Sequence, residues 1–207
     1  EAIVNLEKEG LLKVIPQSGT YVACINCKRS EQEWFVRKSL EIGMVDAIFK
    51  NASADMLDKM AELNNRLINY NEETESIPRI EIDNEFHQLI YECSGEQLAK
   101  NIIKTQMSHY NRIRYLAELN KNISVKTNDE HNMLIDAIRN KDKRMYLRVI
   151  KAHISRIFNE LDKLKGIYPE YFEKNERNSP YIRIFLYHYI KKIKMTDVIY
   201  YHYVSLF

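Results

Sequence analysis

Glycine and proline are scarce in this chain, with five and four copies among 207 residues. These two residues punctuate turns and loops. Their scarcity, together with long stretches in which apolar residues recur at helical spacing, indicates a helical protein.

Cysteine is also rare: Cys24, Cys27 and Cys93 are the three copies. They make no even disulfide framework, which favours a reducing compartment. Cys24 and Cys27 form a C-x-x-C, but no second pair completes a zinc site. No apolar run reaches the roughly 18 residues of a membrane span, and the opening "EAIVNLEKEG" lacks the apolar core of a signal peptide. We therefore expect a cytoplasmic protein with no membrane partner.

No charge of one sign dominates, because 31 basic residues nearly balance 29 acidic residues, for a net charge of +2. The net charge therefore gives no argument for nucleic-acid binding. The hydrophobic fraction of 45% excludes general disorder. The length suits one generous domain, or one domain with attachments.

The first 26 residues differ from the rest of the chain in their sequence pattern. A helix is predicted to end at Gly10, and residues 11–15 and 20–23 read as short strands around the turn 16–19. A helix end and one hairpin cannot bury a core alone. We expect this segment to be the end of a domain that starts upstream.

Helical periodicity begins at residue 30 and continues to about residue 166. "SEQE" at 30–33 has the pattern of a capping box, and Ser124 and Asp142 are expected to cap later helices. The predicted helices lie at about 30–51, 54–70, 79–94, 96–120, 124–140 and 142–166. Short connections between them predict an antiparallel, all-α bundle.

Four residues in these helices could bind one metal ion. Asp83 and His87 are four residues apart, so they share one helix face. His131 and His153 fall on apolar stripes of two further helices. An unpaired buried imidazole is costly, and one shared cation would satisfy all three rings. The donors suit zinc, nickel, manganese or iron. An ion pair for Asp83 and His87, and ordinary core histidines for the others, are the simpler interpretations.

Several motifs in order resemble one family. The opening "EAIVNLEKEGLLKVIPQSGTYVA" is similar to the end of a recognition helix plus the wing of a winged helix-turn-helix domain. The other matching motifs are "RKSLE" at 37–41, "DNEFHQLIYECSG" at 83–95, "DEHNMLIDAIRNKD" at 129–142 and "KAHI" at 151–154. Over residues 1 to about 172, the chain resembles the FadR-type branch of the GntR family of bacterial transcription regulators. That branch carries an all-helical, FCD-type effector-binding domain.

The resemblance implies roles for particular residues. Asp83, His87, His131 and His153 fall on the family's metal ligands, with zinc as the first expectation. The remaining coordination positions would take water or a small organic acid.

Three further residues are expected to bind the effector. Arg37 matches an arginine of the family's first effector-domain helix. His109 and Arg112 are three residues apart on the predicted fourth helix, so both could line the pocket. A cationic pocket of this kind favours a small carboxylate.

The implied function is that of a transcription regulator that binds operator DNA as a homodimer. Gln17, Ser18 and Gly19 of the wing would approach the DNA. The chain begins just after the arginine that opens the family's recognition-helix signature, so we expect the earlier helices of the winged domain upstream.

The expected division is therefore a winged-domain remnant at 1–26, a metal- and effector-binding domain at 30–172 and an atypical tail at 173–207. The whole is an antiparallel bundle of six or seven helices preceded by a helix end and β-wing. The tail reads as a nonfunctional extension, with a seventh helix or a membrane-surface segment as alternatives.

Two other functions stay open from the residues. One is a helical metal-dependent hydrolase, although no general base is obvious. Glu85 is two residues from both Asp83 and His87, Glu130 directly precedes His131, and both are expected to point off the metal face. The other is a dimerisation scaffold with a structural metal. The regulator is our prediction, and we expect no enzyme activity.

Overall fold

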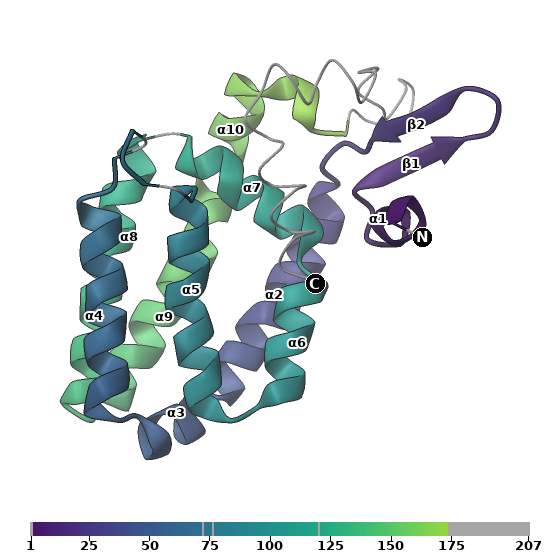
Figure 1. Ribbon diagram of the computed structural model, residues 1–207. Coiled ribbons are helices and arrows are strands. Elements are labelled where there is room, and N and C mark those ends of the chain that lie inside the picture. The colour runs from purple at the N-terminus through teal and green to yellow at the C-terminus, as the bar shows by residue number, and fades with distance from the viewer. Residues whose placement is uncertain (1, 72, 76, 120, 174–207) are drawn as a thin grey trace.

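The computed structural model describes residues 2–71, 73–75, 77–119 and 121–173. It is a bundle of helices with a small hairpin at the N-terminal end (Figure 1). The predicted tail lies outside the described residues from 174 onward. The described elements are α1 Ala2–Lys8, β1 Leu12–Ile15, β2 Gly19–Val22, α2 Cys27–Gly43, α3 Val45–Asn51, α4 Ala54–Ile68, α5 Arg79–Ser94, α6 Gln97–Thr105, α7 Ser108–Glu118, α8 Lys121–Arg139, α9 Lys143–Asn159, α10 Leu161–Ile167 and a 3-10 turn Pro169–Tyr171.

The N-terminal segment matches its prediction closely. Strands β1 and β2 pair antiparallel, with Leu12 opposite Val22. At the turn, both Gln17 and Gly19 have a positive φ, of 62° and 132°. Glycine adopts positive φ values without steric cost. Leu6 and Leu11 join Leu12 and Val22 in a small apolar cluster separate from the main core.

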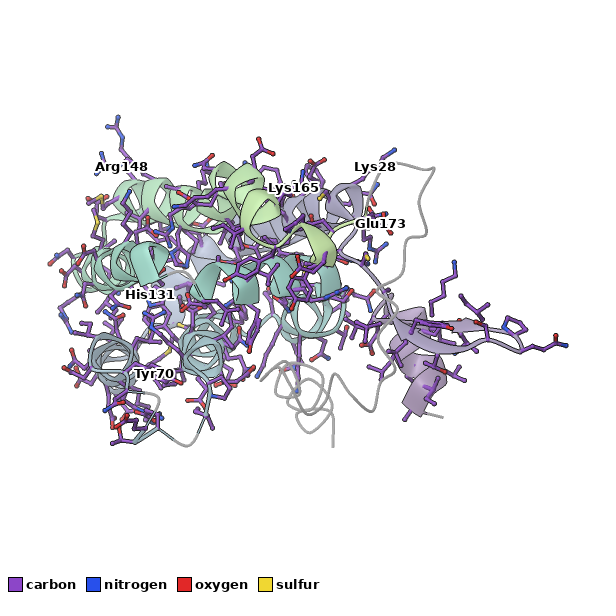
Figure 2. All side chains as sticks on the ribbon, turned by 90° about the horizontal axis from the view of Figure 1, so that it is seen from above. Lys28, Tyr70, His131, Arg148, Lys165 and Glu173 are labelled. Atoms are coloured by element: carbon purple, nitrogen blue, oxygen red, sulfur yellow. The ribbon has the colours of Figure 1, made fainter. Side chains whose placement is uncertain are left out.

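The bundle buries one continuous core. Helix α4 packs against α5 and α8, α8 packs against α9, and α2 packs against α7 and α9. Seen from above, His131 lies among the helices while the hairpin projects to one side (Figure 2). Ile25 forms a parallel bridge with Phe172, which ties the start of α2 to the end of the described chain. Within the described residues, no helix is long and apolar enough to cross a bilayer.

The all-α fold class is confirmed, and several helix boundaries follow local signals. Ser53 accepts a hydrogen bond from Met56 N–H at the start of α4, and Asp142 accepts one from Met145 N–H at the start of α9. Gly95 ends α5 with a φ of 73°.

Other boundaries differ from the prediction. The predicted helices at 30–51, 96–120 and 142–166 are each split, with breaks at Met44, at 106–107 and at Glu160. Helix α8 begins at Lys121 rather than at Ser124.

The capping box predicted at 30–33 is not formed. Asn26 caps α2 instead, by accepting a hydrogen bond from Arg29 N–H, because asparagine is itself a strong N-cap and stands four residues earlier. Ser30 lies inside the helix and is buried.

A candidate metal centre beside an arginine-lined cavity

Three histidines converge inside the bundle. His87 on α5, His131 on α8 and His153 on α9 place one ring nitrogen each within 4.8 Å of the others. The Nε2 atoms of His87 and His153 are 3.0 Å apart. Asp83, one turn before His87, places Oδ1 3.4 Å from His131 Nε2 and Oδ2 3.9 Å from His87 Nε2. The structure therefore brings together all four predicted ligands.

Outer hydrogen bonds orient two of the rings. His131 Nδ1 lies 3.2 Å from Asn64 Oδ1, and His153 Nδ1 lies 2.7 Å from Glu130 Oε2. Both partners are acceptors, so they hold the ring proton on Nδ1 and leave the Nε2 lone pair facing inward. This arrangement of an outer carboxylate or carbonyl oxygen behind a ligating imidazole is typical of metal sites.

The charges at the centre suit a cation. Burial lowers the pKa of His87 and His131 well below the usual value, so both rings are neutral. Burial alone would raise the pKa of Asp83, but the Arg114 guanidinium and the nearby imidazoles hold it well below its usual range. Neutral imidazoles and an ionised carboxylate are the protonation states that metal ligation requires.

Two inward atoms also lack hydrogen bonds. Asp83 Oδ1 and His131 Nε2 are buried and have no hydrogen-bond partner among the described residues. Leaving buried polar atoms unpaired costs free energy. A cation at this point would contact both atoms, so the residues present fit a metal ion by chemistry as well as by position.

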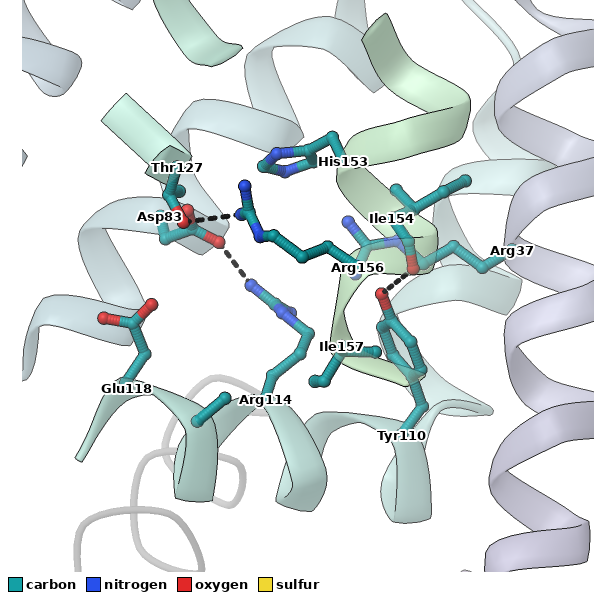
Figure 3. Close-up of a pocket in the computed structure, with 11 residues that line it drawn as sticks. Arg37, Asp83, Tyr110, Arg114, Glu118, Thr127, His153, Ile154, Arg156 and Ile157 are labelled. Carbon is teal, nitrogen blue, oxygen red and sulfur yellow. Dashed lines mark hydrogen bonds and ion pairs between the residues drawn. The ribbon is translucent and has the colours of Figure 1, made fainter. Parts of the chain in front are cut away.

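A cavity with about 450 Å³ of empty space, its mouth included, adjoins the centre (Figure 3). Its polar lining comes from α2, α5, α7, α8 and α9: Arg37, Asp83, Tyr110, Arg114, Glu118, Thr127, His153 and Arg156. A second cavity has about 670 Å³ of empty space, its mouth again included. Arg37 and Arg114 line this cavity as well as the first, and His87 also lines it. The two arginines therefore stand where both cavities meet the centre.

Arg37 is buried and rigidly held. Its Nε donates to Glu41 Oε1 at 2.6 Å, and its NH2 group donates to the Tyr91 hydroxyl at 3.1 Å. Its guanidinium also lies 5.3 Å from the centre of the Tyr110 ring. Such fixed geometry is what a carboxylate-binding arginine needs. Arg37 lines both cavities, and its predicted contact with an effector stays a prediction.

His109 and Arg112 lie elsewhere. They share one face of α7, as their spacing predicts, but neither is among the residues that line the two cavities. Tyr110 and Arg114, also one turn apart, occupy the face of α7 that lines the first cavity. The helical period thus put His109 and Arg112 together correctly, but it could not tell which face of α7 meets the pocket.

His109 instead lies where α7 meets the N-terminal segment. Its Nδ1 accepts a hydrogen bond from Asn26 N–H at 3.1 Å. A Cβ atom on Gly10 would come within 2.9 Å of His109 Nε2. The neighbouring Ser108 hydroxyl donates to Glu9 O at 2.6 Å. The predicted wing residues Gln17, Ser18 and Gly19 are exposed on the hairpin turn.

Sequence reasoning missed the outer partners of the centre. Asn64 stands on α4 and Glu130 directly precedes His131, and neither position carries a sequence signal for contact with an imidazole. Glu130 points away from the ring nitrogens that face inward and also pairs with Arg156 at 2.5 Å. This orientation agrees with the expectation that Glu130 is not a base on the metal face.

Comparison with known proteins identifies the class. A family model described as the FCD domain matches residues 34–156. An uncharacterized HTH-type transcriptional regulator in an unstable DNA locus of Streptomyces ambofaciens is 23% identical over 182 residues, which cover 87% of this chain and 75% of that protein. The HTH-type transcriptional repressor RspR of Escherichia coli K12 is 22% identical over 180 residues, covering 84% and 76%.

Solved structures share the fold. E. coli McbR/YncC superposes with a TM-score of 0.63 at 20% identity, over 80% of this chain and 82% of that one. Streptococcus agalactiae GntR gives a TM-score of 0.53 at 17% identity, over 76% and 78%.

These similarities define a transcriptional regulator that carries an FCD domain, and not an enzyme. The chain belongs to the FCD domain family, and the matched residues, 34–156, include Asp83, His87, His131 and His153. The predicted family is therefore confirmed.

Proposed function

We propose that this regulator senses a small organic acid through a divalent cation held by Asp83, His87, His131 and His153. The observation that carries the proposal is the convergence of three imidazoles from three helices, two of them held from behind by Asn64 and Glu130. Zinc is the expected cation because histidine and carboxylate ligands with an open position suit it. Nickel, manganese and iron are the alternatives.

The effector is a small carboxylate. When bound, the cation supplies positive charge and a coordination position for a carboxylate oxygen. Arg37 and Arg114, which line both cavities, supply bidentate hydrogen bonds to an anion held there. The effector contact predicted for His109 and Arg112 stays a prediction, and the lining of the cavities favours Arg114 in that role.

Helix α7 transmits a change in the occupancy of the pocket to the N-terminal segment. Tyr110 and Arg114 line the cavity, while Ser108 and His109 at the start of the same helix bond to Glu9 O and Asn26 N–H. A displacement of α7 by the effector would therefore move the segment that carries the wing. Such a link gives the two sites a coupling free energy.

The wing is the DNA-contacting end of this chain. Gln17, Ser18 and Gly19 are exposed at the turn of the hairpin, where a glycine allows close approach to the DNA backbone. A homodimer would present two winged domains to two half-sites of an operator in the cytoplasm.

Native mass spectrometry of the 207-residue chain with added zinc tests the proposal. We expect one cation per chain in the wild type, and loss of the cation with a lower melting temperature in His131→Ala. His109→Asn, which changes a buried histidine outside the cluster, should keep the full stoichiometry. A wild type without a cation, or a fully loaded His131→Ala protein, would contradict the assignment.

Thermal unfolding with a panel of carboxylic acids separates the regulator from a scaffold. Binding to the folded state alone raises the melting temperature, by an amount that grows with the logarithm of the ligand concentration once this exceeds the dissociation constant. The proposal predicts stabilisation by at least one acid in the zinc-loaded protein. A dimerisation scaffold with a structural metal predicts none.

A further inference from the structure

Arg114 makes an ion pair with one of the proposed metal ligands. Its NH2 group lies 2.5 Å from Asp83 Oδ2, and its NH1 group donates to Asn111 Oδ1 one turn earlier on α7. Figure 3 shows the guanidinium reaching from α7 across the cavity to Asp83. The other oxygen, Asp83 Oδ1, is the one that faces His131 Nε2. Asp83 therefore stands between a guanidinium on one side and the ring nitrogens on the other.

The other arginines at the cavity have carboxylate partners of their own. Arg37 pairs with Glu41, and Arg156 pairs with Glu130. Arg79, which stands one turn before Asp83, pairs with Glu118. Among the described arginines that line the cavity, Arg114 is the one whose carboxylate partner is also a proposed ligand of the cation.

We infer that Arg114 is an exchangeable partner of Asp83, which neutralises this carboxylate in the cation-free protein and moves to the effector's carboxylate when a cation is bound. The inference rests on the cation site proposed above. The guanidinium and a cation draw on the same negative charge, so each weakens the hold of the other on Asp83. A carboxylate effector gives Arg114 a replacement anion in the same cavity, where it can form the same charge-assisted bonds.

This exchange makes cation and effector binding cooperative. Without an effector, Arg114 competes with the cation for Asp83 and lowers the affinity for the cation. When an effector binds, Arg114 moves from Asp83 to the effector, so the cation binds more tightly. Thermodynamic linkage then requires that the cation raises the affinity for the effector by the same factor. An arginine that only supports the fold would instead favour both binding events.

Zinc affinity of Arg114→Gln, measured by competition with a chromophoric chelator, tests the exchange. Because charge-assisted hydrogen bonds are the strong ones, removing the competitor should tighten zinc binding by about tenfold or more. Arg79→Gln is the matched control: it removes the same charge from a residue near the centre that does not bond to Asp83, and its effect should be clearly smaller. Zinc binding in Arg114→Gln that is unchanged or weaker than in the wild type would overturn the inference.

A second measurement separates exchange from a structural role. In the zinc-loaded protein, calorimetry with the acids that stabilise the wild type should show weaker binding to Arg114→Gln, opposite in direction to the change for zinc. Loss of both affinities would show a structural role. Arg114→Lys, which keeps the charge but not the planar fork, should tighten zinc binding to a smaller extent and serves if the glutamine variant does not fold. A wild type that binds no zinc would instead remove the proposed cation site itself.

Discussion

His109 is held neutral where α7 meets the N-terminal segment. Burial, reinforced by the charges of Arg112 and Arg29, lowers its pKa from 6.5 to about 4. The unfolded chain therefore binds a proton more tightly than the folded protein does. It follows that the contribution of neutral His109 to stability is fully present above about pH 6.5 and is lost as the pH falls towards about 4.

His109→Asn should remove this part of the pH dependence. The asparagine side-chain oxygen can accept the hydrogen bond from Asn26 N–H in place of Nδ1, but it does not titrate. We expect the variant to gain in melting temperature relative to the wild type as the pH is lowered from about 7 to about 4. Parallel thermal unfolding by circular dichroism checks this, because other acid-labile groups are common to both proteins. A difference in melting temperature that is independent of pH would show that His109 does not titrate in this range.

At the centre, what the sequence could predict was limited to the inward ligands. Asp83 and His87 share a face by the helical period, and apolar stripes together with a family resemblance point to His131 and His153. Asn64 and Glu130 could not be selected in this way, because their contacts join helices that are distant in the chain. Arg114 differs from Arg112 in the face of α7 that it occupies, and only packing decides which face meets the cavity.

At the scale of elements, the start of α7 depends on a residue from another helix. Its N-cap position, Met107, makes no side-chain hydrogen bond. Instead Glu33 on α2 accepts a hydrogen bond from Tyr110 N–H at 2.8 Å. Glu33 is buried, so it satisfies a backbone donor that water does not reach.

Glu33→Ala should therefore destabilise the protein by about 1–3 kcal/mol, the cost of leaving a buried donor without an acceptor. Glu31→Ala, an exposed position on the same helix, removes the same charge and is expected to have a small effect. Urea unfolding of both variants gives the comparison. Equal free energies of unfolding for the two variants would mean that Glu33 is not the acceptor that stabilises α7.

This dependence also explains which elements the sequence could predict. Helices α4 and α9 begin at caps that lie next to them in the chain, Ser53 and Asp142, and α5 ends at Gly95. The break at 106–107 has no glycine or proline and no local cap, because its backbone donor is satisfied from α2. Local signals therefore fixed the number of long helical segments but not their interruptions.

At the scale of the whole molecule, α7 spans the distance between the cavity and the hairpin. The hairpin has its own small apolar cluster, and it meets the bundle through Glu9, Gly10 and Asn26 at the start of α7. Gly10 has a φ of 74°, and a Cβ atom there would come within 2.9 Å of His109 Nε2, so a larger residue would press on this contact. A change of this one residue should loosen the hairpin without touching the metal centre.

Gly10→Ala tests whether occupancy of the centre reaches the hairpin through this contact. Gly95→Ala is the matched control, since its φ of 73° brings the same backbone strain while a Cβ there meets nothing within 4 Å. Both variants should lose about 1–2 kcal/mol from the left-handed conformation. The rate of hydrogen–deuterium exchange of residues 11–23 should change when zinc and a carboxylic acid effector are added, both in the wild type and in Gly95→Ala. In Gly10→Ala that segment should exchange faster at the outset and no longer respond, with zinc stoichiometry unchanged. A wild-type response in Gly10→Ala would place the coupling outside the contact between Gly10 and His109.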